Sequence, residues 1–311
     1  MLRAAFLALS RSRRIQQAAL HTPLLRRAAR RFVAGEQLSE ALEAVRRLNA
    51  AGLAATLDFL GEGVTSRERA EASGRAYGRI LDAVHASGVR SHLSLKLTQL
   101  GLDVDEVLCH RILREILDRA GGTFVRIDME SSRYTDRTLR LFEALWAEGR
   151  RNVGVVIQSY LRRSARDVER LIALGARVRL VKGAYAEPPS VAFPRKADVD
   201  VNFARLAARL LGAGTYPAIA THDERLIEEA IRTAASLGVA PDRFEFQLLY
   251  GVRRDLQMRL AQRGYRVRIY VPFGEEWYPY FMRRLAERPA NVWFVLRSMV
   301  LERREDPRKR G

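Results

Sequence analysis

The stretch VGVVIQSYLRRSARDVERLIALGARVRLVKGAY, residues 153–185, contains the pattern that decides the fold. Two short apolar runs, 153–160 and 178–185, flank an amphipathic stretch at 164–175 whose apolar residues recur at helical spacing. A buried strand, a helix and a second buried strand in this order are typical of a βαβ unit, in which the two strands run parallel.

The same alternation continues in both directions along the chain. Strand-like runs are expected at eight places, Leu53–Leu60, His92–Leu97, Phe124–Glu130, Val153–Tyr160, Val178–Tyr185, Pro217–His222, Phe244–Gly251 and Val267–Gly274. Helix-like stretches follow them at 67–87, 105–119, 135–149, 164–175, 197–213, 223–237, 252–263 and 276–288. Eight such units predict an α/β fold, a (βα)8 TIM-type barrel. An open doubly wound sheet is the alternative, but no GxGxxG or GxxxxGK[ST] motif occurs.

The N-terminal region differs from the rest of the chain. Its first 31 residues contain eight arginines and no acidic residue. This composition is typical of a mitochondrial transit peptide and equally of an amphipathic arm that packs on the domain or on an anionic membrane. A further helix is expected at about 37–50. We therefore expect an N-terminal helical arm at 1–50 and a barrel catalytic domain at 51–311, ending in a helix and a short basic tail.

Composition narrows the function classes. Hydrophobic residues make up 48% of the 311 residues, which excludes whole-chain disorder, and no apolar run is long enough to span a bilayer. The single cysteine, Cys109, excludes an intramolecular disulfide, and the histidines have no metal-ligand spacing, so no metal is expected. The net charge of +18 fits an anionic partner, but acids are interspersed and no nucleic-acid-binding signature occurs, so no nucleic acid is expected.

Polar residues gather at the ends of the expected strands. Lys96 ends the second run, and Arg126, Asp128 and Glu130 alternate along the third, so that these three share one face. The carboxyl ends of barrel strands surround the active site. In the other runs, or directly after them, stand Glu62, Gln158, Tyr160, Arg179, Lys182, Tyr185, Thr221, His222, Asp223, Glu245, Gln247 and Tyr270.

The last expected helix carries a charged face. Tyr280, Arg283, Arg284 and Glu287 stand at i, i+3, i+4 and i+7, while the other side of the helix is apolar. A helix that is apolar over much of its surface is typically buried, so the ionic face is expected to line a cavity. Two neighbouring guanidinium groups can clamp a carboxylate, and Glu287 can hold an ammonium group. A surface pair between Arg283 and Glu287 is the alternative.

The sequence Lys182-Gly183-Ala184-Tyr185 ends the fifth run. Only four of the 54 basic residues are lysines, and a compact ammonium group beside glycine suits a phosphate or a flat electron-rich ring.

Several of these segments together resemble the monofunctional, bacterial-type proline dehydrogenases. The resemblance rests on eight collinear segments, SLKLTQLG (94–101), RIDME (126–130), VVIQSYL (155–161), RLVKGAY (179–185), ATHDE (220–224), FEFQLLYG (244–251), RIYVPFG (268–274) and YFMRRLAERPAN (280–291). RRFVAGE (30–36) is similar to the N-terminal helical segment of the family, which favours the arm over the transit peptide. Residue 186 departs from the family pattern, because alanine stands there in place of a larger residue.

The resemblance implies an activity. These enzymes are distorted (βα)8 barrels that oxidise L-proline to Δ1-pyrroline-5-carboxylate, the first step of proline catabolism. A hydride passes to N5 of non-covalently bound FAD, and the electrons pass to a membrane quinone. The resemblance therefore implies a cytoplasmic protein, with possible peripheral attachment to the inner face of the membrane, or a mitochondrial one if the source is eukaryotic.

The resemblance also assigns roles to residues. Arg283 and Arg284 would bind the proline carboxylate, Glu287 and Lys96 would complete the polar cage that Asp128 supports, and Glu62 would pair with Arg283 as a gate. The pyrrolidine ring would be packed by Tyr270, Tyr280, Ala184 and Leu249, and Tyr270 would crowd the hydroxyl of 4-hydroxyproline. The flavin would be held by Gln158, Arg179 (near N5), Lys182, Gly183, Ala184, Tyr185, Lys196, Thr221, His222 and Gln247.

Two alternatives remain open. One is another flavin barrel oxidoreductase, such as a methylenetetrahydrofolate reductase, which would not need the paired arginines of the last helix. The other is a non-enzymatic basic binding module on a barrel scaffold, whose binding would weaken steeply with salt.

Overall fold

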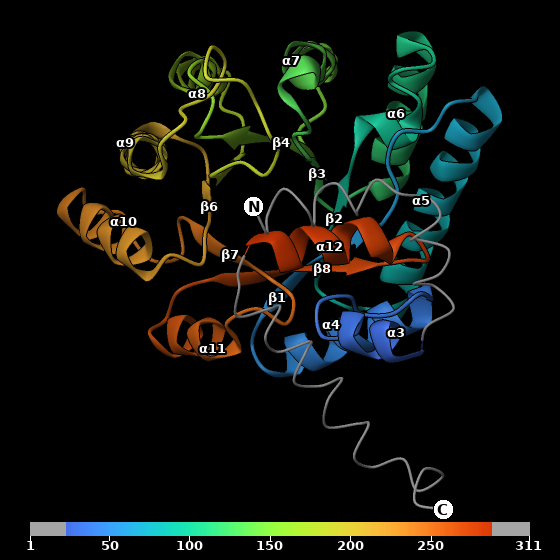
Figure 1. Cartoon of the computed structure of the whole chain (residues 1–311), viewed down its shortest axis with the longest axis horizontal. Coiled ribbons are helices and arrows are strands. Elements are labelled where there is room, and N and C mark those ends of the chain that lie inside the picture. The colour runs from blue at the N-terminus through green and yellow to red at the C-terminus, as the bar shows by residue number, and fades with distance from the viewer. Residues whose placement is uncertain (1–22, 288–311) are drawn as a thin grey trace, which may run out of the picture.

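Eight parallel strands close into a barrel (Figure 1). The structure is a computed structural model that describes residues 23–287 of the chain. The strands are β1 (Ala54–Phe59), β2 (Ser91–Leu95), β3 (Val125–Ile127), β4 (Val153–Gln158), β5 (Val178–Val181), β6 (Ala218–Ala220), β7 (Glu245–Leu249) and β8 (Val267–Phe273). Each strand pairs in parallel with its neighbour in sequence, and β8 closes the barrel on β1. Each overlaps one predicted run, so the (βα)8 prediction is confirmed.

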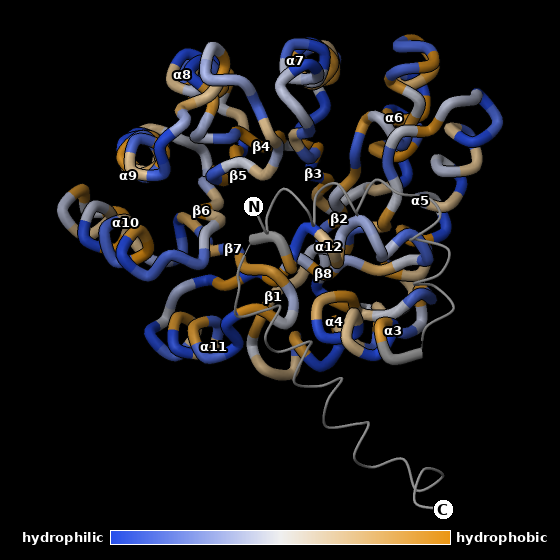
Figure 2. The backbone as a smooth tube through the Cα atoms, viewed as in Figure 1, coloured by the Kyte–Doolittle hydropathy of each residue, from blue (hydrophilic) through white to orange (hydrophobic). Residues whose placement is uncertain are grey.

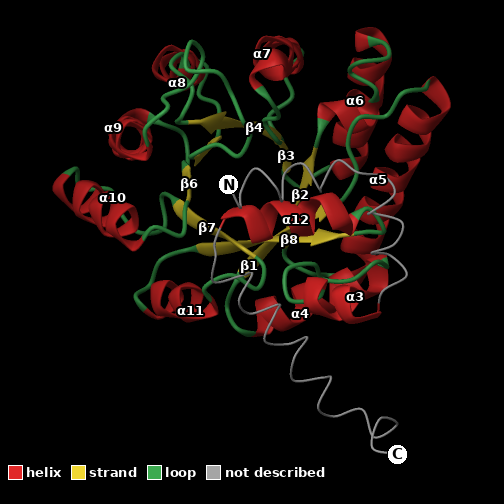
Figure 3. Ribbon diagram, in the orientation of Figure 1, coloured by secondary structure: helices red, strands yellow, loops and turns green. Residues whose placement is uncertain are grey.

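Helices surround the strands (Figure 3). They are α3 (Pro23–Ala29), α4 (Leu38–Ala50), α5 (Arg67–Ser87), α6 (Glu106–Ala120), α7 (Ser132–Ala147), α8 (Ser164–Ala173), α9 (Lys196–Ala213), α10 (Glu224–Ser236), α11 (Arg254–Gln262) and α12 (Trp277–Glu287), with a short 3₁₀ helix, η1 (Leu97–Leu100), after β2. Figure 2 shows both hydrophilic and hydrophobic stretches on the helices around the barrel, as expected for helices with one buried face.

Local sequence signals set several helix ends. Ser66 precedes α5 and its hydroxyl accepts a hydrogen bond from the backbone N–H of Arg69. The Asp105 carboxylate caps α6 in the same way, accepting from the N–H of Val107 at 2.9 Å. Gly88 ends α5 with φ +64°, in the left-handed region that glycine tolerates. These caps satisfy backbone groups that helix ends leave without partners.

Alternation along the strands separates two environments. On β1, Ala55 and Leu57 pack into the main apolar core under the helices, whereas Thr56 and Asp58 are buried on the opposite, inward side. The same alternation makes much of the barrel interior polar. Near the amino ends of the strands, Arg126, Glu245 and Arg268 form what we call the lower ionic layer. Nearer the carboxyl ends lies the upper ionic layer, Asp58, Lys96, Asp128 and Arg179.

The observed strands are shorter than the predicted runs at their carboxyl ends. The largest difference is in β5, which was predicted to reach Tyr185 but ends at Val181. Gly183 has φ +119°, and a Cβ there would lie 2.3 Å from the ring of Tyr160. The chain therefore turns out of the sheet here, at a position that only glycine fits.

The segment before the barrel packs on α12. Phe32 and Val33 share an apolar cluster with Trp277 and Phe281 of α12, and the indole N–H of Trp277 donates to Glu36 at 3.0 Å. Figure 1 shows α12 lying in front of the barrel strands, near α3 and α4. The division into an arm at 1–50 and a barrel domain at 51–311 stays a prediction, because its terminal parts, 1–22 and 288–311, lie outside the described residues.

Within residues 23–287, none of the helices combines the length and the apolar character that crossing a membrane requires.

Candidate active site

A cavity of about 530 Å³ lies at the carboxyl ends of the strands, the location of active sites in (βα)8 barrels. Its lining residues come from six of the strands, from the segments that follow β2, β3, β5 and β6, and from α9 and α12. Its lining comprises Asp58, Lys96, Asp128, Met129, Val156, Gln158, Arg179, Val181, Lys182, Gly183, Ala184, Tyr185, Lys196, Ala220, Thr221, His222, Asp223, Gln247, Leu248, Leu249, Tyr270, Tyr280, Arg283 and Arg284.

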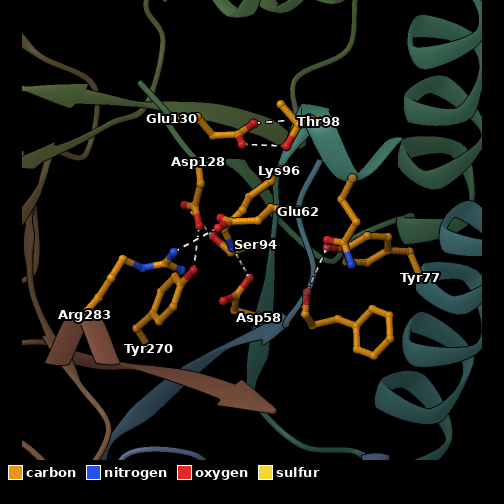
Figure 4. Close-up of polar contacts among 12 residues, drawn as sticks. Asp58, Glu62, Tyr77, Ser94, Lys96, Thr98, Asp128, Glu130, Tyr270 and Arg283 are labelled. Atoms are coloured by element: carbon orange, nitrogen blue, oxygen red, sulfur yellow. Dashed lines mark hydrogen bonds and ion pairs between the residues drawn. The ribbon is translucent and has the colours of Figure 1, made fainter. Parts of the chain in front are cut away.

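Asp128, at the cavity floor, accepts hydrogen bonds from three side chains. One carboxylate oxygen accepts from the Arg179 guanidinium at 2.7 Å and from the Ser94 hydroxyl at 2.9 Å. The other accepts from the Tyr270 hydroxyl at 2.6 Å (Figure 4). The Arg179 guanidinium also lies over the Tyr270 ring, at 5.3 Å from its centroid. Burial and the Asp128 charge raise the pKa of Tyr270 well above its ordinary value, so its hydroxyl remains a donor at neutral pH.

Lys96 faces the same floor from the end of β2. Its ammonium nitrogen lies 3.0 Å from Asp58 Oδ1 on β1, and both side chains are buried. Burial alone would lower the pKa of Lys96, but the carboxylates of Asp58 and Asp128 more than offset this and raise it. The lysine is therefore held in its charged form.

Helix α12 covers the cavity with its charged face, while its apolar side packs on the N-terminal segment. Arg283, Arg284 and Tyr280 line the cavity, and the Arg284 guanidinium lies 5.0 Å from the centroid of the Tyr280 ring. Arg283 donates to Glu62 at 2.9 Å, which ties α12 to the loop after β1. Although burial would raise the pKa of Glu62, the charges of Arg283 and Lys96 outweigh it and lower the pKa.

The other side of the cavity contains a group of lysines and aspartates. Lys182, directly after β5, lies 2.6 Å from Asp200 of α9 and 2.9 Å from Asp223 at the start of α10. Lys196 also pairs with Asp200. Helix α9 therefore brings Asp200 and Lys196 close to Lys182 at the mouth of the barrel.

Three polar side chains connect this side to the floor. His222 Nε2 accepts from the backbone N–H of Leu249 at 3.0 Å, so the proton of the neutral ring is on Nδ1. The Gln247 amide oxygen accepts from Arg179 Nε at 2.5 Å. Gln158 donates to the backbone carbonyl of Glu130 at 2.9 Å.

The structure brings nearly all the predicted site residues to one cavity. The predicted residues that line it are Lys96, Asp128, Gln158, Arg179, Lys182, Gly183, Ala184, Tyr185, Lys196, Thr221, His222, Gln247, Leu249, Tyr270, Tyr280, Arg283 and Arg284. Glu62 does not line the cavity but pairs with Arg283, which does. Glu287 ends α12, and its side chain lies outside the described part of the chain.

Sequence reasoning missed two carboxylates at the site. Asp58 lines the floor, and its signal was present as the one acidic residue in the apolar run Leu53–Leu60. Asp200 pairs with two of the three lysines that line the cavity, Lys182 and Lys196. Asp200 is buried on α9, but its role could not be recognised from the sequence, because its partner Lys182 lies on another element that only the fold brings close.

The fold and the site together define a (βα)8-barrel enzyme for a small carboxylate-bearing substrate. Arginines and a lysine converge on a cavity that is also large enough for part of a planar cofactor. A model of the family described as proline dehydrogenase matches residues 41–297, and the chain belongs to this family. Membership implies a flavin cofactor and proline as the substrate.

Curated relatives agree with this assignment. Proline dehydrogenase of Deinococcus radiodurans is 45% identical over 278 residues, which cover 88% of this chain and 90% of that protein. Proline dehydrogenase 1 of Bacillus subtilis is 42% identical over 302 residues, covering 96% of this chain and 99% of the relative.

Solved structures of larger proteins share the barrel. Proline utilization A from Bdellovibrio bacteriovorus, inactivated by N-propargylglycine, superposes with a TM-score of 0.79 at 27% identity, covering 84% of this chain. This chain corresponds to 32% of that protein's length, so the two are alike over this part alone.

Proposed function

We propose that this chain oxidises L-proline to Δ1-pyrroline-5-carboxylate with FAD as its cofactor and passes the electrons to a membrane quinone. The observation that carries the proposal is the convergence of Arg283 and Arg284 of α12 with Lys96 on one cavity beside Arg179. Three cationic groups at the mouth and floor suit a carboxylate, and arginine can bind it in a bidentate manner.

The remaining residues complete a cage for proline. Asp128 holds the hydroxyl of Tyr270, so that the tyrosine ring is fixed at the cavity wall. Tyr280, Ala184 and Leu249 also line the cavity and would pack around the pyrrolidine ring. Glu287 would hold the substrate nitrogen. Glu62, through its pair with Arg283, would act as a gate that excludes water.

Substrate binding sets the charge state for the reaction. Proline enters as a zwitterion, and its carboxylate is neutralised by the arginines. Loss of the amine proton to solvent frees the nitrogen lone pair, which would form a C=N double bond as a hydride leaves the neighbouring ring carbon for the two-electron acceptor. The role of the cage is to hold that carbon in a reactive orientation and to exclude water.

The residues present fit a flavin. The cavity offers Arg179 and Gln247 at its floor, and Lys182 beside Gly183, where the absence of a side chain lets the backbone approach a ligand. Thr221, His222, Gln158, Tyr185 and Lys196 would hold the rest of the cofactor. Bound there, FAD would supply the two-electron acceptor. Arg179 would place a positive charge beside the flavin ring, favouring its electron-rich reduced form.

Attachment to a membrane surface would bring the protein to its electron acceptor. The net charge of +18 supports peripheral binding to the anionic inner face of the cytoplasmic membrane, or of the mitochondrial inner membrane in a eukaryote. Co-sedimentation with anionic vesicles at low salt, lost at high salt, is the expected result. Absence of binding by the full chain, and by a chain without residues 1–22, would contradict it.

The catalytic proposal is tested by product analysis. The purified holoprotein is incubated with L-proline and a water-soluble quinone, and the cofactor is released and identified by mass. We expect a product that lacks two hydrogens of proline, and FAD as the released flavin. Methylenetetrahydrofolate oxidation in place of proline oxidation would favour the other flavin barrel class. A protein without flavin that also fails to take up FAD would favour the binding module.

A further inference from the structure

One carboxylate on the cavity floor has no role in the proposed function. Asp58 lies near the end of β1 and its side chain is 1% exposed. Alternation along the strand turns it inward with Thr56, and it lines the cavity. A buried carboxylate is costly without a partner, so its presence at this depth requires a physical reason.

The partner of Asp58 is Lys96, the cation at the cavity floor. Oδ1 accepts from the lysine ammonium at 3.0 Å, and the lysine side chain is 10% exposed (Figure 4). Oδ2 is buried and accepts no hydrogen bond from the described residues. The lysine is therefore the group that compensates this carboxylate, and the carboxylate in turn fixes the direction of the ammonium group.

The neighbouring charges are sorted into separate pairs. Asp128, the other floor carboxylate, already accepts from Arg179, Ser94 and Tyr270. Arg179 thus forms its ion pair with Asp128, and Lys96 forms its ion pair with Asp58. Besides Asp58 and Asp128, the titratable groups that interact with the Lys96 ammonium include Tyr77 of α5, Glu62 of the loop after β1, Glu130 after β3 and Tyr185 after β5. Tyr270 of β8 acts on Asp58.

Burial and pairing act on Lys96 in opposite directions. Burial lowers the pKa of the lysine, and the Asp58 carboxylate is the largest of the charges that raise it. Removal of that charge leaves a buried ammonium group with weaker compensation, and a buried lysine without a close counter-ion has a lowered pKa. Asp58 thus determines both the direction and the charge of Lys96.

We propose that Asp58 is a positioning residue that holds Lys96 charged and directed into the cavity, so that the ammonium group meets the carboxylate of the substrate. The inference rests on the proposed oxidation of L-proline and extends it by one residue. Asp58 itself does not contact the reacting atoms. Its effect on proline passes through Lys96.

The kinetic test uses three variants and one control. Asp58→Asn removes the charge but keeps the shape of the side chain, Lys96→Met removes the cation, and the double variant combines both. Thr56→Val is the matched control, because Thr56 is buried on the same inward face of β1 and its hydroxyl has no hydrogen-bond partner in the described structure. Flavin content and thermal unfolding confirm that each variant is folded.

The expected result is specific to a positioning role. Asp58→Asn raises the KM for L-proline on the order of tenfold, about 1.4 kcal/mol, with a smaller change in kcat. The kcat/KM of this variant also falls at an alkaline pH at which the kcat/KM of the wild type does not yet change with pH. Adding Asp58→Asn to Lys96→Met causes no further loss, because the effect of the aspartate requires the lysine. Thr56→Val behaves as the wild type.

Other outcomes overturn the inference. An unchanged KM and pH profile in Asp58→Asn contradicts it, and so do losses that add in the double variant. Both results leave proline oxidation by the wild type intact, so they are distinct from failure of the proposed function. A wild type that does not oxidise proline removes the proposed function and this inference with it.

A spectroscopic measurement covers the case in which Asp58→Asn does not fold. The chain has four lysines, so selective ¹⁵Nζ labelling gives few signals in the NMR spectrum, and Lys96→Met assigns the one of interest. In the wild-type holoprotein we expect the Lys96 ammonium to remain charged at a pH where free lysine titrates. Titration of Lys96 at or below the pH of free lysine would overturn the inference.

Discussion

Both ionic layers of the barrel interior arise from the alternation of residues along the strands. The lower layer is enclosed by the protein, whereas the upper layer borders the cavity. In the lower layer, Arg268 contacts both oxygens of Glu245 at 3.0 and 3.1 Å and donates to the carbonyl of Ala55 at 2.7 Å. Arg126 donates to the carbonyls of Arg177 and Val155, and Gly154 leaves the space for its guanidinium. These contacts are all internal, so the layer stabilises the closed barrel.

The upper layer contains the same kinds of side chain but borders the cavity. Asp58, Lys96, Asp128 and Arg179 line it, and Oδ2 of Asp58 accepts no hydrogen bond within the described structure. Gln247 links the layers, because its amide accepts from Arg179 and donates to Glu245. The comparison teaches that depth in the barrel, rather than residue type, separates a structural charge from a functional one.

The largest effect is expected in the lower layer. Glu245→Leu leaves Arg268 and Arg126 buried without their counter-charge, and breaking a buried pair in this way costs about 3–5 kcal/mol. Urea unfolding of the holoprotein measures the loss. A variant as stable as the wild type would mean that this layer is no more structural than the upper one.

Glu130, three residues beyond the end of β3, extends the comparison to the rim. Burial raises its pKa to about 7, although hydrogen bonds from the Thr98 hydroxyl and N–H oppose the shift. The folded state therefore binds a proton more tightly than the unfolded state, and stability is lost as pH rises from about 4.5 to about 7.

The variant Glu130→Gln removes this pH-dependent loss. Each pKa unit corresponds to about 1.4 kcal/mol, so the unfolding free energy of the variant relative to the wild type is expected to rise by up to about 3 kcal/mol across that window. Urea unfolding at a series of pH values provides the measurement. Parallel curves for the two proteins would show that Glu130 does not titrate in this range.

In the upper layer, activity is expected to suffer more than stability. Asp128→Asn removes the charge that orients Arg179 and the acceptor that fixes Tyr270. We expect kcat/KM for L-proline to fall on the order of 10²-fold, the cost of small misplacements in a catalytic site.

The loss of unfolding free energy in this variant should be smaller than in Glu245→Leu. The Asp128 side chain is 14% exposed, whereas that of Glu245 is 2% exposed, so solvent can compensate the change at Asp128. If Asp128→Asn left turnover unchanged and lost more unfolding free energy than Glu245→Leu, the distinction between the two layers would be removed.

The smallest effect is expected at the rim pair between Glu62 and Arg283. Their side chains are 36% and 19% exposed, so the pair contributes about 0.5–1 kcal/mol. Glu62→Gln loosens the link between α12 and the loop after β1, and a KM for L-proline raised about threefold is expected from steady-state kinetics. A KM equal to or lower than that of the wild type would count against a gate.

The sequence predicts the barrel well because its signals are local. Buried parallel strands appear as short apolar runs, and the alternation of Arg126, Asp128 and Glu130 places these residues on one face without knowledge of the fold. The charged face of α12 is equally local, since helical spacing alone brings Arg283, Arg284 and Tyr280 together.

The depth of a side chain in the barrel and the identity of its ionic partner depend on contacts between distant segments. Both were therefore harder to predict from the sequence. Whether Arg126 or Asp128 borders the cavity depends on how the strands are staggered, for example on Thr56 of β1 standing beside Tyr270 of β8. The partners of Lys96 and Lys182 lie 38 and 18 residues away, respectively, on other elements. Asp58 was therefore overlooked, although one acidic residue in an apolar strand already indicates a buried partner or a function.

The visible spectrum of the purified protein, recorded before and after anaerobic addition of L-proline, tests the central claim most directly. If the upper layer and α12 form a proline site beside a flavin, the flavin absorption band bleaches with L-proline. It does not bleach with 4-hydroxyproline, whose hydroxyl Tyr270 is expected to crowd. A flavin band that L-proline leaves unchanged would contradict the account.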